Sequence, residues 1–598
     1  MGLLQNAYDT YCAMERRTGE YETGKQPLAP VSHTVTAAQI EISLDQDGKF
    51  LSAMAVDKES GKIIIPVTQE SANRTRKLAA HPLCEQIGYL CESNTEKYEL
   101  YLTQLERWNA SPWSHPKLKP VLVYVKSNHI LPDLDRCGLV TLDAKGKPEK
   151  DKQMICWRIV DPGSSTPPEC WKDKTLFQAF IDYYRNTCEM PEDFCMISGE
   201  VAALSEGNPK GVVALYGNAK IISSNDDRGF TYRGRFENSR QAATVGYDVS
   251  QKAHSALRWL VANQGVIVGG RVFLCWNPQG VMMQQAISPL LRKSESPIYR
   301  PSDYRQDLQR TILGEREHLP PNAKTVIVAF DAANTGRLSV TYYGELAASD
   351  FIQRLHDWDI NCCWYHWYGA IEAPRLKSIV DCAYGVQRKQ KERYYFATDD
   401  AILGQQLQRL LACRVSCARM PEDILNRLFD RVSNPMSYDE SLWNELLFVT
   451  CAVIQKYYAP KLKEDLCMDW ELNRKDYSFQ YGRLLAVMDW VEAAYYKKVK
   501  EERQTNAMKS LSVFRKTPLR ISEQVNAKLE NAYLPRLSGQ KREQYDSLRN
   551  EIIANLCQCS TDLNAPLNEY YLIGYSLQKN ALAKKNNPGE DLTENEEE

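Results

Sequence analysis

The chain has 598 residues and carries 74 Lys and Arg against 76 Asp and Glu, a formal net charge of -2. This near-neutral balance excludes a uniformly basic nucleic-acid coat, so any contact with nucleic acid must rest on local clusters of positive charge. Apolar residues make up 43% and charged residues 25%, which excludes wholesale disorder and fibrous architectures and predicts two or three folded domains.

Targeting signals and cysteine pairs are not evident in the sequence. The first residues lack a basic stretch followed by an apolar run, and no run of about 18 apolar residues occurs later. The 18 cysteines are scattered and form no CxxC pair, which favours reduced thiols over disulfides or a zinc site. We therefore expect a cytoplasmic protein that needs no metal and no other cofactor.

The N-terminal part of the chain is predicted to mix helices with strands. Residues 2–18 have apolar positions at helical spacing and predict an amphipathic helix. Helices are also predicted at 97–109, 175–188 and 250–263, the last with Asp248 as its N-cap. Runs rich in β-branched or alternating apolar residues predict strands at 35–44, 62–67, 121–125, 153–160, 211–216 and 271–276.

The strand signals end with a hairpin and then become rare. Strands at 325–330 and 337–343 would be joined by a loop over 331–336. From about residue 372 the apolar residues recur at helical spacing, so the predicted fold class is α+β: a mixed α/β region over 1–371, then a helical region over 372–585 that ends in a bundle. Residues 586–598 carry six acids and no aromatic residue, which predicts a disordered tail.

Catalytic motifs are not recognisable in the sequence. A P-loop needs Gly-x4-Gly-Lys-Ser/Thr, which does not occur. The dipeptide His356-Asp357 is typical of metal-dependent phosphohydrolases, but such a centre needs further ligands from other helices. We predict that the chain is not an enzyme. The alternative is a metal-dependent nuclease or phosphohydrolase that uses His356, Asp357 or His366.

The first of three basic clusters is the run Asn73-Arg74-Thr75-Arg76-Lys77, three cations within four residues. Gln69 and Ser71 precede it with amide and hydroxyl groups that also bind phosphates or base edges. We predict that Gln69 and residues 73–77 bind DNA. The alternative is a helix start or loop whose charges only face solvent.

The second cluster, residues 223–240, interleaves cations with rings and two glycines. Proteins that bind single strands or RNA use arginines to bind phosphates and aromatic rings to stack on bases. The predicted contacts to RNA or DNA are Arg228, Phe230, Tyr232, Arg233 and Arg235, and an ordinary polar hairpin is the alternative; Phe236 and Arg240 complete the pattern.

The third cluster lies between Lys497 and Arg520. It has eight basic residues against Glu501 and Glu502, so its net charge is 8 minus 2, or +6. On a helical bundle such a face could hold the backbone of a displaced strand or of a guide duplex; a solvated helix end is the alternative. The predicted DNA contacts are Lys497, Lys498, Lys500, Arg515 and Lys516.

The order of several segments resembles the large subunit of type I-C CRISPR Cascade, over nearly the whole chain. The matching blocks are the helix at 4–11, Ile65-Pro66-Val67 with Asn73-Arg74-Thr75, Ile197-Ser198-Gly199-Glu200, Pro209-Lys210-Gly211-Val212, the loop 223–236, the helix 253–260, Gly336-Arg337-Leu338-Ser339-Val340, Tyr481-Gly482-Arg483-Leu484 and Tyr571-Leu572-Ile573-Gly574-Tyr575. Each block is short, but their shared order is specific.

The resemblance implies an RNA-guided surveillance complex. Its large subunit recognises the protospacer-adjacent motif, supports R-loop formation and recruits a separate helicase-nuclease, while base pairing by the guide reads the remaining sequence. The implied partners are the guide crRNA, double-stranded target DNA, the backbone, crRNA-processing and small subunits, the helicase-nuclease and viral anti-CRISPR inhibitors. Region 1–371 would bind the guide end and the DNA near the motif.

Three further expectations come from the same resemblance. The loop 73–77 would read the duplex, and the arginines of the second cluster would contact guide RNA or opened DNA. The small subunit would arise by internal translation from Met468, giving 598 minus 468 plus 1, or 131 residues. The remaining alternative is a scaffolding protein whose basic clusters touch no nucleic acid.

Overall fold

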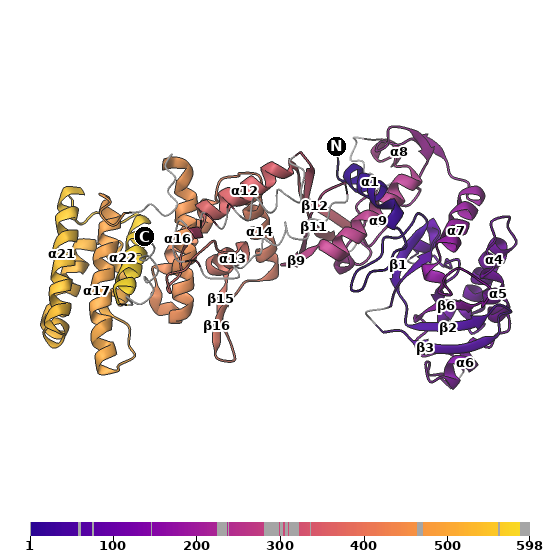
Figure 1. Cartoon of the computed structure of the whole chain (residues 1–598), viewed down its shortest axis with the longest axis horizontal. Helices are drawn as coiled ribbons and strands as arrows, with labels where there is room; N and C mark the ends of the chain where they lie inside the picture. The colour runs from indigo at the N-terminus through magenta and orange to yellow at the C-terminus, as the bar shows by residue number, and fades with distance from the viewer. Residues whose placement is uncertain are drawn as a thin grey trace, which may run out of the picture. The chain divides into compact units, whose positions relative to one another are not determined.

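A computed structural model of the chain describes residues 2–57, 61–74, 77–144, 146–223, 239–279, 322–334, 336–462, 471–559 and 562–586, with positions 236, 298, 303, 304, 306 and 309. Figure 1 labels many of its elements. The contacts divide the chain into two compact units. The first comprises Met1–Ile267, Arg271–Met283 and Lys324–Glu345, and the second comprises Val268–Gly270, Gln284–Ala323 and Leu346–Glu598. The boundary predicted at residue 371 lies inside the second unit.

The first unit contains a four-stranded sheet in the order β3-β2-β6-β5. β2 pairs parallel with β6, and β3 and β5 pair antiparallel at the edges. β2 is buried along most of its length because helices and the remaining chain cover the sheet. The strands are Ile40–Asp45 (β2), Phe50–Ala55 (β3), Glu85–Gln86 (β5) and Met154–Val160 (β6), and the helices that share their core are Ile87–Leu90 (α3), Thr95–Asn109 (α4), Leu118–Lys126 (α5), Ile130–Arg136 (α6) and Lys174–Thr187 (α7).

A second sheet in the order β12-β11-β10-β9 carries two helices, α1 and α9, on a separate core. Trp276 on β10 donates its indole N–H to Thr10 Oγ1 at 3.0 Å, which fixes α1 to the sheet. The elements are Leu3–Met14 (α1), Tyr247–Gln264 (α9), Val266–Val268 (β9), Arg271–Trp276 (β10), Lys324–Asn334 (β11) and Arg337–Ala347 (β12). Short elements complete the unit: His33–Ala37 (β1), Lys62–Pro66 (β4), Gln69–Asn73 (α2), Glu192–Phe194 (β7), Val201–Ala203 (β8) and Ser239–Ala242 (α8).

Most predicted elements of this unit are confirmed, and five details are wrong. The strand predicted at 35–44 is two strands, β1 and β2, which lie in different sheets. Residues 121–125 lie in the helix α5, because Leu118, Val121 and Val125 share one buried helical face. Residues 214–216 form a 3-10 turn in place of a strand. The hairpin strands β11 and β12 are longer than predicted and leave only two residues between them. Asp248 lies in the first turn of α9, whose N-cap is Gly246.

The second unit is mostly helical, as predicted. Its helices are Ala348–Asn361 (α12), Leu376–Tyr384 (α13), Asp400–Val415 (α14), Glu422–Val432 (α15), Glu440–Leu462 (α16), Tyr477–Val499 (α17), Asn506–Lys509 (α18), Leu511–Phe514 (α19), Pro518–Lys528 (α20), Gly539–Cys559 (α21) and Tyr570–Asn586 (α22). Two small hairpins were not predicted: Trp364–Tyr365 (β13) with Ile371–Glu372 (β14), and Val386–Gln390 (β15) with Arg393–Ala397 (β16). Within the described residues, no helix is long and apolar enough to span a bilayer. The α+β fold class is confirmed.

Two glycines set the distance between α17 and α22. A Cβ at Gly482 would meet the Tyr571 carbonyl oxygen at 1.8 Å, and a Cβ at Gly574 would meet the Phe479 carbonyl oxygen at 2.1 Å. No side chain fits at either contact. The two helices therefore pack backbone to backbone, and each supplies the glycine that the other requires.

Gly574→Ala is expected to force α17 and α22 apart and to lower the free energy of local unfolding by about 2 kcal/mol or more, as overpacking does in a close-packed core. Hydrogen exchange of the α17 and α22 amides, followed by mass spectrometry, measures this loss. Gly539→Ala is the matched control, because a Cβ there meets nothing within 4 Å. Equal protection in the two variants would contradict the packing argument.

Candidate nucleic-acid interface

The predicted DNA-binding loop begins as a capped helical turn. Thr68 Oγ1 accepts the Ser71 backbone N–H at 3.1 Å, and Ser71 Oγ accepts the Thr68 N–H at 3.0 Å, so the two residues form a reciprocal cap at the start of α2. The Gln69 N–H donates to the Tyr184 hydroxyl at 3.0 Å. These bonds fix α2 against α7 directly after β4.

Gln69 and Asn73 join α2 to a segment far along the chain. Gln69 Oε1 accepts the backbone N–H groups of Glu206 at 2.9 Å and Gly207 at 3.2 Å. Asn73 Nδ2 donates to the Gly207 carbonyl at 3.2 Å. Both side chains thus position the 205–207 segment, while their predicted contact with DNA stays a prediction.

Arg74 is held in an internal ion pair. Its guanidinium binds the fully buried Glu85 carboxylate through two hydrogen bonds of 2.5 and 2.8 Å, donates to the Ala79 carbonyl at 2.7 Å and lies 4.8 Å from the centre of the Tyr89 ring. Lys77 is exposed. Thr75 and Arg76 lie outside the described residues. The structure therefore gives Arg74 an internal role, and its predicted DNA contact remains untested.

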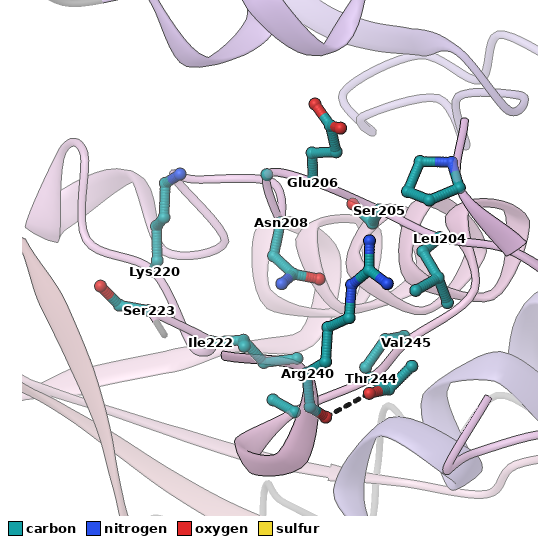
Figure 2. Close-up of a pocket in the computed structure, with 13 residues that line it drawn as sticks. Leu204, Ser205, Glu206, Asn208, Lys220, Ile222, Ser223, Arg240, Thr244 and Val245 are labelled. Atoms are coloured by element: carbon teal, nitrogen blue, oxygen red, sulfur yellow. Dashed lines mark hydrogen bonds between the residues drawn. The ribbon is translucent and has the colours of Figure 1, made fainter. Parts of the chain in front are cut away.

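The 205–208 segment lines a pocket of about 350 Å³ (Figure 2). Arg240 extends its guanidinium toward this segment, and Lys220 lies at another side of the pocket. Glu206 also lines it, but its carboxylate points away from Arg240. The Arg240 backbone carbonyl accepts the Thr244 hydroxyl, which holds the short α8 turn against the pocket wall.

Positive charge accumulates behind this pocket. Lys210 Nζ donates to the Arg74 carbonyl at 2.8 Å, and Arg258 donates to the Lys210 carbonyl and to Thr34 Oγ1. Among the described residues, none of Lys210, Lys220, Arg240 and Arg258 has a carboxylate partner. Burial lowers the pKa of Lys220, burial and neighbouring cations lower the pKa of Lys210, and burial lowers the pKa of Arg258 to about 10.

Such an arrangement favours an anion. Partly buried cations without counter-charges are costly, and a bound phosphate would remove that cost while accepting several charge-assisted hydrogen bonds. Ser223 and Arg240, which flank the second basic cluster, both line the pocket. Of that cluster, Arg228, Phe230, Tyr232, Arg233 and Arg235 lie outside the described residues.

The comparison with known families identifies the family of the chain. The sequence model of the CRISPR-associated protein family Cas_Csd1 matches residues 6–583. The chain belongs to the Cas_Csd1 family. No curated protein matches it at a significant level. Cas_Csd1 proteins are the large subunits of type I-C Cascade, so the resemblance inferred from the sequence blocks is confirmed, and the chain is a component of a CRISPR complex with crRNA and target DNA.

The third basic cluster of this Cas_Csd1 chain is partly engaged within the second unit. Lys498 Nζ donates to the Arg536 carbonyl at 2.7 Å. Arg515 pairs with Asp430 at 3.0 Å and lies 4.0 Å from the centre of the Phe429 ring. Lys497, Lys500 and Lys516 are exposed. Like Lys509 and Arg520 of the same cluster, these three lysines are exposed and accessible to a phosphate backbone.

The residues of the alternative metal site have local partners. His356 Nδ1 lies 3.6 Å from Asp357 Oδ1, and His366 Nε2 lies 3.2 Å from Glu372 Oε2 while its ring stacks on Phe448. In the part of the chain that the structure describes, no three His, Cys, Asp or Glu side chains form a group that could hold a metal.

Lys210, Lys220 and Arg258 were not among the site residues predicted from the sequence. Lys210 belongs to the block Pro209-Lys210-Gly211-Val212, which resembles the type I-C large subunit, but no contact was predicted for it. The other two carry no local charge pattern. The three residues are separated along the chain, and only the tertiary fold brings them together into a cluster.

Glu85→Gln is expected to leave the Arg74 charge without its buried partner and to lower the free energy of local unfolding by about 3 kcal/mol. Hydrogen exchange over residues 77–90 measures this. Glu106→Gln is the control, because Glu106 pairs with Lys126 at the surface, where both side chains are about half exposed, and such pairs contribute less than about 1 kcal/mol. An equal, small effect of both substitutions would show that the Arg74 pair does not anchor the loop.

Proposed function

We propose that this Cascade subunit recognises the protospacer-adjacent motif, supports R-loop formation and recruits a separate helicase-nuclease, which performs the cleavage. The observation that carries the proposal is the cluster of unneutralised cations, Lys210, Lys220, Arg240 and Arg258, beside the loop that begins at α2. Proteins that grip nucleic acid through its backbone concentrate Lys and Arg in this way.

The proposed roles divide between support and contact. Gln69, Asn73 and Arg74 hold the loop and the 205–207 segment in place through the bonds described above. Arg76 and Lys77 contact the duplex at the motif. Phosphate contact falls to the cations at the pocket, because Lys220 and Arg240 have no internal partner among the described residues.

Two further contacts belong to the same proposal. The arginines and rings at 228–235 contact guide RNA or opened DNA, which is supported by the position of Ser223 and Arg240 on the pocket wall. The exposed Lys497, Lys500 and Lys516 hold the backbone of the displaced strand. Base pairing by the guide supplies the sequence selection, so these contacts need little base specificity.

Lys220→Ala and Arg240→Ala are expected to weaken target binding by the assembled, crRNA-loaded complex for every motif tested, because each removes a phosphate contact. The slope of log K against log salt should fall by roughly 1 for each. Lys119→Ala is the control, since Lys119 is exposed on α5 and does not line the pocket. Unchanged slopes in both pocket variants would remove these residues from the interface.

The joint substitution of Arg76 and Lys77 by Ala is expected to act differently from the pocket variants. Loss of the reader contacts should reduce the ratio of affinities between targets that differ only in the adjacent motif, with assembly of the complex intact. Binding assays with matched duplexes measure that ratio. A ratio equal to that of the unaltered complex would exclude the loop as the motif reader.

A further inference from the structure

A second pocket, of about 610 Å³, lies within the second unit, lined by residues of the β13–β14 turn, α13, β16 and α16. One of its residues, His366, is a metal ligand in the alternative hypothesis of a metal-dependent nuclease or phosphohydrolase. The proposed function uses none of them. Three kinds of side chain meet here: exposed aromatic rings, carboxylates and arginines.

The aromatic part of the pocket faces solvent. Trp367 is 64% exposed, Tyr368 46% and Tyr395 40%. Large rings in contact with water at one place mark a binding surface more often than a fold requirement. Behind them, the His366 ring stacks between Tyr368, at 4.9 Å, and Phe448, at 3.8 Å. This stack holds the turn that carries Trp367 on the buried face of α16.

The carboxylates of the pocket differ in their partners. Asp381 pairs with Lys377 and accepts the Thr398 hydroxyl. Glu372 binds His366 Nε2 at 3.2 Å. Glu445 is half-buried and has no hydrogen-bond partner among the described residues. Burial, together with the charge of Glu372, raises the pKa of Glu445, while His366, Arg393 and Arg375 act in the opposite direction. A half-buried acid without donors is a group that a ligand with N–H donors would satisfy.

The arginines lie at the same pocket without ion pairs. Arg375 and Arg393 are exposed, and neither has an ion-pair partner among the described residues. The pocket thus offers a ring surface, an acceptor and two cations at once. A cationic peptide would satisfy the acid but meet the arginines, and an apolar peptide would leave Glu445 without a partner.

We propose that this pocket binds one unpaired nucleobase of a single strand, with guanine preferred. The base stacks on Trp367, its Watson–Crick N–H donors bind Glu445, and the adjoining phosphates lie toward Arg375 and Arg393. Guanine fits best because its N1–H and N2 amino group present two donors side by side, which a carboxylate accepts together. The inference takes from the proposed function only that the ligand is nucleic acid.

The test uses the full chain and a labelled short oligothymidylate in which the central base is either dT or dG. Fluorescence anisotropy is expected to show several-fold tighter binding of the dG probe. Trp367→Ala should weaken binding of the dG probe by about tenfold, the usual scale for loss of one base–aromatic stack. Glu445→Gln should keep most of the affinity for dT and lose the preference for dG.

Met436→Ala is the control, because Met436 is 58% exposed in the same unit and does not line the pocket. Trp367→Ala behaving like this control with both probes would overturn the inference. So would a Trp367→Ala variant that fails to assemble into Cascade but binds both probes normally, since the pocket would then dock a protein.

Failure of the proposed function would look different. Lys220 and Arg240 lie in the first unit, and their variants are measured by salt dependence on duplex targets. A preference for dG that depends on Trp367 and Glu445 supports the nucleobase pocket even where those variants bind every target as the unaltered complex does. Loss of duplex binding with no base preference in the single-strand assay would support only the proposed function.

Discussion

The interface of the first unit depends on one buried carboxylate. Glu85 is fully buried at the start of β5 and accepts four hydrogen bonds: two from the Arg74 guanidinium and one each from the backbone N–H groups of His81 and Gln86. An ionised acid survives in the interior only when its charge and lone pairs are met. Because β5 pairs with β6, this acid ties the loop after α2 to the central sheet.

The same pairing explains why the neighbouring cations remain unbalanced. Arg74 uses the buried acid on both of its oxygens, so Lys210 and Arg258 find only carbonyl and hydroxyl oxygens. Carbonyl groups accept hydrogen bonds but carry no net charge, so the local charge stays positive. Burial lowers the pKa of both Lys210 and Lys220, and for Lys210 the neighbouring cations lower it further. A phosphate bound as proposed would supply the negative charge that these cations lack.

Local patterns in the sequence were sufficient to predict the fold class and long amphipathic helices such as α4 and α7. In these helices the buried residues recur at helical spacing. Local patterns gave a wrong prediction at 121–125. A short apolar run is compatible with either a strand or a buried helix, and only the length of the element distinguishes the two. Charge density found the Arg74 loop, but not that Arg74 is internal, because its partner lies eleven residues later on another element. Lys220 and Arg258 could not be found at all, since only the folded chain brings them near Lys210.

Near-neutral total charge and concentrated local charge suit a subunit whose sequence selection is delegated to a guide. Non-specific affinity for DNA grows with the number of phosphates that a protein neutralises, so a chain that was basic throughout would bind every duplex and slow the search. A few cations without internal partners can bind the phosphate backbone of nucleic acid only at the positions where they lie. In the second unit, the aromatic pocket and the backbone contact of α17 with α22 have a different physical basis, ring surface and close packing, which salt hardly screens. In the proposed function, the phosphate contacts of both units therefore weaken as salt rises, whereas ring stacking in the pocket of the second unit does not.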